Sequence, residues 1–316
     1  MYFLEKLDAS VSGYRNIYFG MNLFGEEVGI VYKDNYLLDA GVSFSCRPGG
    51  LAILWKGSAV DVPELPPQVD IIDRLGDSFV IASRLLAARG MEEGDELSER
   101  EVNAWIVDEF GRIQRSLFLG NEFSHLSADR DGNIWVGYRD KPSWWRVPFE
   151  EGADGEDDRV SFLPGLLRWS AEGRVNWTLP SQGTSGEFFS CYALNSGPLG
   201  TVAALDHENL VVHVDVDGST SMFPSTVIAP QGIAFDGEKF VFLGNYGLRR
   251  KRTSRVGFDL ISVGIVKNGK IEIQDISRVV MPNGDPLPHF PQGVSCAGKS
   301  IMMNFGDPGV VFKLVL

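Results

Sequence analysis

Glycines that recur at nearly regular intervals constrain the fold of this chain more than any other feature. One series follows strand-like runs and precedes a small or basic residue, at Gly57, Gly111, Gly173, Gly218 and Gly269. The steps between its members are 54, 62, 45 and 51 residues, with a mean of 53. Self-similarity at a fixed period of this size is typical of repeat architectures, so the spacing indicates the fold class before any single element does.

A second series of glycines interleaves with the first. Its members, Gly76, Gly132, Gly237 and Gly298, each have an apolar residue three positions later. Their steps are 56, 105 and 61 residues, so the middle step spans two repeats. Two hairpins in each repeat give four antiparallel strands, which we name A, B, C and D in chain order.

Six repeats of about 53 residues account for the 316 residues of the chain. We therefore expect an all-β fold, a β-propeller of six four-stranded blades that forms a single domain over residues 1–316. Repeat lengths from 45 to 62 leave a five- or seven-bladed count open. Asp217-Gly218 and Asn268-Gly269 are predicted to form type I′ turns, because both central positions of that turn need positive φ.

The two ends of the chain predict how the propeller closes. The last repeat has strand-like segments near Val294, at Ile301–Met303 and at Val310–Leu316, and then no fourth strand. Residues Tyr2–Leu7 are strand-like and have no hairpin partner nearby. We expect them to complete the last blade, which would remove two exposed sheet edges. The strand boundaries within residues 9–30 stay open at this point.

Composition excludes several classes of partner. The chain has 29 Lys and Arg against 42 Asp and Glu, a net charge of −13, which repels a phosphate backbone, so we expect no nucleic-acid partner. No apolar run approaches the roughly 18 residues that span a bilayer, and no basic stretch precedes an apolar one at the N-terminus, so we expect no membrane partner. The three cysteines, Cys46, Cys191 and Cys296, fit neither a disulfide framework nor a zinc site. These features predict a cytoplasmic protein.

Two segments carry a resemblance to known families. Ala128–Tyr138, A-D-R-D-G-N-I-W-V-G-Y, resembles the repeat of two-component-regulator propellers. Pro230–Asn245, P-Q-G-I-A-F-D-G-E-K-F-V-F-L-G-N, is similar to repeats of NHL and gluconolactonase-like propellers, and Pro291–Val294 repeats its opening. The resemblance covers two or three blades and implies the fold. Propellers of these families include hydrolases, sensors and interaction platforms, so the site has to indicate the function.

Three connections between strands B and C are long and charged. Residues 84–101 carry six acidic side chains, residues 139–164 carry seven, and residues 245–256 carry five basic ones. In a propeller these connections lie on one face together with the D-to-A connections, so we expect two acidic insertions and one basic insertion there. Such segments are either solvated loops or a charged interaction surface that steers a partner.

The second insertion also holds a dense group of residue types that are enriched in binding hot spots. Our leading hypothesis is a non-catalytic cytoplasmic propeller that binds a protein or peptide without a cofactor. Its binding side chains would lie in the second acidic connection, residues 139–164, and in the basic connection, residues 245–256. The predicted binding residues are Trp144, Trp145, Arg146, Phe149, Arg249, Arg250, Lys251 and Arg252. The alternative for the aromatic group is a cap that folds back over the blade.

The competing hypothesis is a metal-dependent hydrolase of lactones or small esters. Gluconolactonase-like propellers hold a divalent cation, so the resemblance implies a site in which the metal polarises a carbonyl or activates water. The Glu-Gly-Pro opening of that family does not occur in this sequence. Oxygen ligands suit calcium. The candidate ligands are Asp140, Asp206, Asn245 and Asp307, which lie on the connections that follow strand B.

Other catalytic patterns are weaker. Asp129, Asp131 and Asn133 suggest a calcium loop, but Ile134 stands where an EF-hand needs glycine, so this pattern predicts a hairpin turn. His125 and His289 are candidate general bases with ordinary polar residues as the alternative, whereas we expect His213 to be structural and His207 to lie in a short turn. The sequence contains no G-x-S-x-G elbow, P-loop or dinucleotide fingerprint.

Overall fold

The computed structural model of the chain is all-β over its described part, with one 3₁₀ turn at His207–Asn209. Among these residues no helix is long and apolar enough to cross a membrane. The described residues are 2–8, 14–23, 25–33, 37–38, 45–46, 49–66, 69–84, 102–120, 123–138, 165–179, 190–245, 257–305 and 310–315.

The chain divides into two compact units, which we describe separately. Unit 1 comprises Met1–Ser10, Phe19–Glu27 and Phe189–Leu316, and unit 2 comprises Val11–Tyr18 and Val28–Phe188. The prediction of a single domain over residues 1–316 stays a prediction.

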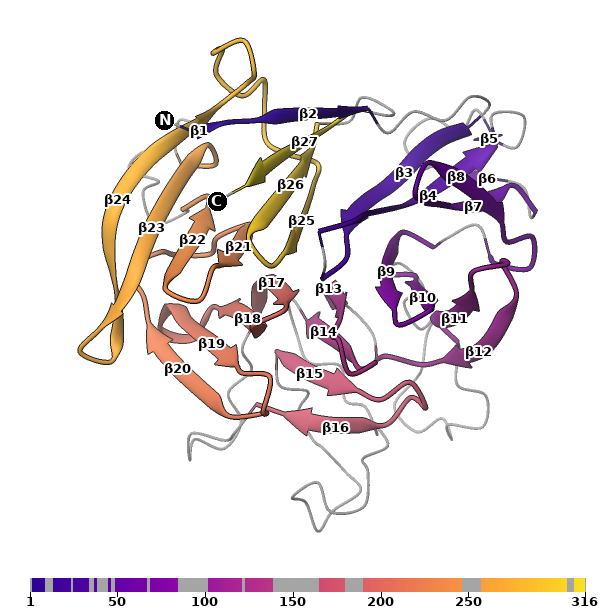
Figure 1. The fold of residues 1–316 in the computed structure, drawn as a ribbon, viewed down its shortest axis with the longest axis horizontal. Helices are drawn as coiled ribbons and strands as arrows, with labels where there is room; N and C mark the ends of the chain where they lie inside the picture. The colour runs from indigo at the N-terminus through magenta and orange to yellow at the C-terminus, as the bar shows by residue number, and fades with distance from the viewer. Residues whose placement is uncertain are drawn as a thin grey trace, which may run out of the picture. The chain divides into compact units, whose positions relative to one another are not determined.

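Three four-stranded sheets, the first three blades, form in sequence order from residues 14 to 178 and make up most of unit 2 (Figure 1). A two-stranded sheet of β5 (Leu37–Leu38) and β6 (Ser45–Cys46) interrupts the B-to-C connection of blade 1. The strands are, in blade 1, β3 (Tyr14–Met21), β4 (Glu27–Lys33), β7 (Leu51–Trp55) and β8 (Ser58–Asp61); in blade 2, β9 (Ile71–Leu75), β10 (Ser78–Ala82), β11 (Ala104–Asp108) and β12 (Ile113–Leu117); and in blade 3, β13 (Phe123–Ala128), β14 (Ile134–Tyr138), β15 (Leu166–Trp169) and β16 (Val175–Thr178).

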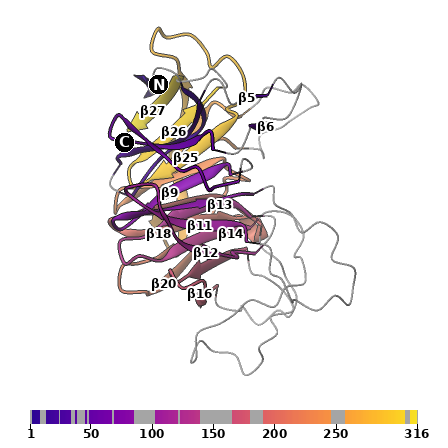
Figure 2. The same cartoon turned by 90° about the vertical axis from the view of Figure 1, so that its right-hand side faces the viewer.

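Unit 1 holds blades 4 to 6, and in the view turned by 90° the strands β25 and β26 of blade 6 lie side by side (Figure 2). Six groups of four strands in succession are the blades of a six-bladed β-propeller; β17 and β25 join blades 4 and 6 in one eight-stranded sheet, and β1 adds a fifth strand to blade 5. The strands are, in blade 4, β17 (Cys191–Gly197), β18 (Gly200–Leu205), β19 (Leu210–Val214) and β20 (Thr220–Pro224); in blade 5, β21 (Gly232–Phe235), β22 (Lys239–Leu243), β23 (Leu260–Lys267) and β24 (Lys270–Val280); and in blade 6, β25 (Gly293–Ala297), β26 (Ser300–Asn304), β27 (Val310–Val315) and β2 (Glu5–Asp8).

The N-terminal segment completes the last blade, as predicted. Strand β2 pairs antiparallel with β27, with Leu7 opposite Val311, and supplies the missing fourth strand (Figure 1). The preceding strand β1 (Tyr2–Phe3) pairs in parallel with the end of β24, in blade 5, which the sequence did not indicate. The open question about residues 9–30 is also answered, because Tyr14–Met21 forms the first strand of blade 1.

Both glycine series lie at the predicted hairpins. The first series falls in the C-to-D turns and the second in the A-to-B turns, and every member has positive φ. The long step in the second series is the hairpin of blade 4, where Gly200 with φ of 109° replaces the missing member. Glycine is suited to these positions because it adopts positive φ without a steric penalty.

The type I′ prediction is right for one hairpin and wrong for another. Asn268 and Gly269 have φ of 51° and 74°, as a type I′ turn requires. At Gly218 only the glycine has positive φ, and the Asp215 amide donates to the Ser219 carbonyl across a wider loop. The longer loop holds a turn that ends in one left-handed glycine, so Asp217 keeps an ordinary backbone conformation.

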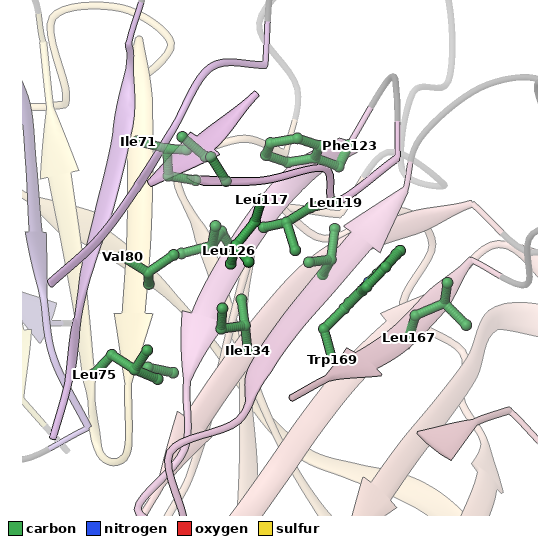
Figure 3. Close-up of a cluster of buried hydrophobic side chains, with 14 of the residues drawn as sticks. Ile71, Leu75, Val80, Leu117, Leu119, Phe123, Leu126, Ile134, Leu167 and Trp169 are labelled. Carbon is green, nitrogen blue, oxygen red and sulfur yellow. The ribbon is translucent and has the colours of Figure 1, made fainter. Parts of the chain in front are cut away.

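The hydrophobic cores lie between neighbouring blades of each unit. In unit 2, Leu75 and Val80 of blade 2 pack with Ile134 and Trp169 of blade 3 (Figure 3), and a second cluster joins blades 1 and 2. In unit 1, one cluster joins blades 4 and 5 and another joins blades 5 and 6, with Leu4 buried in the latter. Burial of both faces of a blade explains why the B strands read as nearly continuous apolar runs.

Candidate functional site

Most of the predicted site residues lie outside the described residues. This holds for the predicted binding residues Trp144, Trp145, Arg146, Phe149, Arg249, Arg250, Lys251 and Arg252, and for the predicted metal ligands Asp140 and Asp307. The strands on either side are described, and they make 139–165 the B-to-C connection of blade 3 and 244–259 that of blade 5. The placement of the two segments between strands B and C is therefore confirmed, and their part in binding stays a prediction.

The two predicted metal ligands that are described, Asp206 and Asn245, accept hydrogen bonds from backbone amides. The Asp206 carboxylate accepts a hydrogen bond from the Ser190 amide at 2.8 Å, and Asp206 is half-buried. The Asn245 side chain is buried, and its Oδ1 accepts from the Ile228 amide at 3.3 Å. Each oxygen therefore links the residue that follows strand B to the segment that precedes strand A of the same blade. No cluster of three or more His, Cys, Asp or Glu that could hold a metal ion is found among the described residues.

The two ends of the basic connection of blade 5 are hydrogen-bonded to each other. The Asn245 amide donates to the Gly257 carbonyl at 2.9 Å, and the Gly244 amide donates to the Leu260 carbonyl at 2.8 Å. A Cβ on Gly257 would lie 2.5 Å from the Asn245 carbonyl oxygen, and Gly257 has φ of 105°, so only glycine fits. The segment that carries the predicted basic residues is therefore closed at its base.

Aromatic side chains surround this base. Phe258 follows it directly and lies 6.0 Å, centroid to centroid, from Phe290 of the D-to-A connection between blades 5 and 6. Phe290 is 43% exposed, whereas Phe305, whose ring lies 5.6 Å from His289, is buried. Sequence reasoning missed Phe290, although its place in P-L-P-H-F-P marks a proline-stiffened connection. An exposed aromatic beside a closed basic segment is suited to binding.

A pocket of about 410 Å³ lies at the other end of the sheets of unit 1, where the A-to-B turns are. It is formed where β17, β21 and β25 lie side by side (Figure 1). Among the described residues that line it, Lys299 is the one charged side chain. The lining residues are Gly25, Asn195, Gly197, Pro198, Leu199, Gly200, Val202, Phe235, Ala297, Gly298, Lys299 and Ser300.

One buried amide organises this pocket. The Asn195 Nδ2 atom donates to the carbonyls of Ile233 and Gly298 at 2.8 and 2.9 Å, and its Oδ1 accepts from the Gly298 amide at 2.7 Å. Ser196 pairs with Ala297 in a parallel bridge between blades 4 and 6. The sequence did not indicate this junction, because a lone Asn within a strand carries no local signal of what it joins.

Unit 2 has a buried carboxylate in a comparable position. Asp73 of β9 is 3% exposed, and its Oδ2 accepts from the Ala128 amide at 2.7 Å and the Ser127 hydroxyl at 3.2 Å, both on β13. Burial raises the pKa of Asp73 to about 7, although these hydrogen bonds and one from the Arg74 amide act in the opposite direction. A titrating group near neutral pH therefore lies between blades 2 and 3.

The structure places the remaining candidates in strands and turns. The Asp129 carboxylate accepts from the amides of Asp131 and Asn133 at 2.9 Å each, which confirms a hairpin turn in place of a calcium loop. His213 lies within β19, and its Nε2 is 3.1 Å from the carbonyl oxygen of Leu199. His207 is in the predicted short turn. His125 lies within β13 and not before it.

The sequence matches no known family model and no curated protein. Solved structures similar to it are propellers of low identity. Virginiamycin B lyase from Staphylococcus aureus has 12% identity over 99% of both chains, with a TM-score of 0.48. The extracellular domain of a putative one-component system from B. thetaiotaomicron has 10% identity over 99% of this chain and 40% of that one, with a TM-score of 0.47. A putative gluconolactonase has 11% identity over 99% and 92%, with a TM-score of 0.42.

These similarities concern the fold alone.

Proposed function

We propose that this protein is a non-catalytic β-propeller that binds an acidic protein or peptide partner. The binding side chains are those of the B-to-C connections in blades 3 and 5: Trp144, Trp145, Arg146, Phe149, Arg249, Arg250, Lys251 and Arg252. The single observation that carries the proposal is the exposed Phe290, packed on Phe258 beside the closed base of the basic segment. It supplies an apolar anchor where the basic residues supply charge.

Charge distribution supports an acidic polypeptide as the partner. The basic segment stands out from a chain whose net charge is −13. At physiological salt, electrostatic interactions are screened over about 8 Å, so a short acidic segment responds to the local cations. A nucleic acid extends far beyond that distance and would meet the acidic remainder of the surface. A peptide with acidic and apolar side chains fits both the cations and Phe290.

The described polar side chains at this end of the sheets support a non-catalytic role. Asp206 and Asn245 already accept hydrogen bonds from the amides of Ser190 and Ile228. These bonds fix the segments that precede the first strands of blades 4 and 5. Such residues define the positions of neighbouring loops, which a binding surface needs. No observation on the described residues favours the lactone hydrolase, and calcium binding by Asp140 and Asp307 with these two stays untested.

We also propose a cytoplasmic location for the protein. Cys191 and Cys296 are free and buried, and burial raises the pKa of each thiol to about 12. Thiols of this kind persist in a reducing compartment and need no disulfide partner.

Fluorescence anisotropy with defined peptides tests the proposed function. The probe is a labelled peptide in which glutamate alternates with leucine and phenylalanine, and its counterpart carries lysine at the glutamate positions. We expect the acidic peptide alone to bind. A variant with Arg249, Arg250, Lys251 and Arg252 all changed to Glu should weaken binding roughly a hundredfold, because attraction becomes repulsion.

A matched control lies at the other end of β23, the strand that follows the basic connection. Lys267→Glu with Lys270→Glu reverses two exposed charges at the C-to-D turn of blade 5 and should leave the affinity unchanged. Phe290→Ser and the double change of Trp144 and Trp145 to Ala should each weaken binding. Equal binding of the two peptides, or unchanged binding by the charge-reversed variant, would contradict the proposal.

A further inference from the structure

We propose that the pocket at the A-to-B turns of unit 1 binds a small amphipathic carboxylate, an organic acid with an aliphatic body. This inference is independent of the proposed function, because the pocket lies at the opposite end of the sheets from the B-to-C connections. Its volume of about 410 Å³ suits a small molecule.

The walls of the pocket offer apolar contact. Leu199 occupies a two-residue turn between β17 and β18 and is 43% exposed, and Phe235 is half-buried. Turns of this kind usually carry Gly, Asn, Asp or Ser, so a leucine at the tip leaves apolar surface in contact with water. The aliphatic body of a ligand would cover this surface together with Val202.

Lys299 gives the pocket its charge preference. Its side chain is exposed, and among the described residues no carboxylate lies within ion-pair distance of its Nζ. Asp236 interacts electrostatically with Lys299, but its Oδ1 accepts hydrogen bonds from the amides of Glu238 and Lys239 in its own turn. Lys299 therefore keeps its ammonium available for a ligand carboxylate.

The backbone explains why one carboxylate fits better than a phosphate. The Gly298 amide already donates to Asn195 Oδ1, the Phe235 amide donates to the Gly298 carbonyl, and Pro198 has no N–H. Phosphate groups are usually held by several N–H donors or by Arg side chains. Among the described residues that line the pocket, Lys299 is the one cation, which matches a group with a single negative charge.

The elements that form the pocket are held together by hydrogen bonds and by a close approach of two turns. Asn195 of β17 makes three hydrogen bonds, one to Ile233 of β21 and two to Gly298 in the turn that follows β25, and it is 1% exposed. A Cβ on Gly197 would lie 2.7 Å from the Cα of Gly298, so the two turns approach as closely as glycine allows. A preformed site does not lose affinity to the ordering of its own loops.

Octanoate, octanol and octylamine are the probes that test this inference, by isothermal titration calorimetry on the full chain. We expect octanoate to bind with measurable heat, and octanol and octylamine to bind at least tenfold more weakly. Lys299→Met should reduce octanoate affinity about tenfold, and Leu199→Asp should abolish it, because its charge repels the carboxylate. Lys239→Met is the matched control, an exposed lysine outside the pocket lining that should leave the affinity unchanged.

Hydrogen exchange locates the binding and covers the case of a variant that misfolds. Octanoate should slow amide exchange in residues 195–200 and 297–300 of the unaltered protein. Equal binding of octanoate and octanol, unchanged affinity in Lys299→Met, or protection elsewhere would overturn the proposal.

Discussion

Two buried polar side chains, one in each unit, join the first strands of neighbouring blades by different chemistry. Asn195 in unit 1 is neutral and both donates and accepts, so it satisfies two carbonyls and one amide. Asp73 in unit 2, when ionised, only accepts, and its partners are the Ala128 amide and the Ser127 hydroxyl. Both side chains hydrogen-bond to backbone groups of another blade, yet only the carboxylate titrates.

The difference shows what each junction permits. An amide holds its partners at every pH, so the turns around Asn195 keep their positions and leave a stable pocket. A buried carboxylate favours its protonated form, so the Asp73 junction changes with pH near neutrality. Unit 1 is therefore the unit in which we expect pH-insensitive ligand binding.

Asn195→Asp should have the largest effect on the comparison. The aspartate cannot donate to Ile233 and Gly298 when ionised, and it places a charge at a site that is 1% exposed. We expect the free energy of unfolding to fall by about 3–5 kcal/mol, measured by urea denaturation at neutral pH. Asn268→Asp in an exposed turn is the control and should change it by less than about 0.5 kcal/mol. A loss below about 1 kcal/mol at Asn195 would contradict the role of the amide.

The Asp73 junction should make stability depend on pH. Its folded-state pKa is about 7, above the unfolded value of 3.8, so the folded state binds more protons between these values. The contribution of this group is full below pH 3.8 and is lost as the pH rises through 7. The free energy of unfolding should fall by about 1.4 kcal/mol per pH unit in this window.

Asp73→Asn removes this group and supplies the reference curve. We expect the unaltered protein to lose stability relative to Asp73→Asn as the pH rises from about 4 to 7, in urea titrations at a series of pH values. Parallel curves for the two proteins would show that Asp73 does not titrate in this range.

Gly197→Ala tests the close approach of the two turns beside Asn195. Its Cβ would lie 2.7 Å from the Cα of Gly298, and backbone cannot move aside as a side chain can. We expect a loss of about 1–3 kcal/mol in thermal or urea unfolding. Gly293→Ala is the control, since its Cβ would meet nothing nearer than the Asn304 Cβ at 4.0 Å. If both variants lose the same stability, the approach of the turns is not the cause.

Ser127→Ala should have the smallest effect. It removes one hydrogen bond of 3.2 Å to Asp73, which costs about 1 kcal/mol. Because that bond lowers the pKa of Asp73, the variant should also raise this pKa further, which NMR titration of the carboxyl measures. Ser277→Ala, whose hydroxyl bonds the exposed Asp275, is the comparison and should leave the pKa of Asp73 in place.

Glycine spacing predicted the blade count and the hairpins, because positive φ is a local requirement that the sequence displays. The strand-like segments at the two ends of the chain predicted the closure by the N-terminal strand. The wide loop at Gly218 was mistaken because two-residue and longer loops share the same Asp-Gly pair. The bridge between Ser196 and Ala297 was not predictable, since it depends on which strands meet.

Only part of the candidate site could be predicted from the sequence. Charged insertions are visible as composition, so residues 139–164 and 245–256 were found. Phe290 and the pocket around Asn195 were missed, because exposure and the convergence of three strands arise from packing.

Hydrogen exchange in the presence of the acidic peptide tests the central functional claim most directly, namely that the partner binds where the B-to-C connections leave the sheets. The account predicts slowed exchange at residues 257–260 and 286–292, with residues 195–200 unchanged. Protection confined to residues 195–200 and 297–300, or no protection at a peptide concentration that saturates binding, would contradict it.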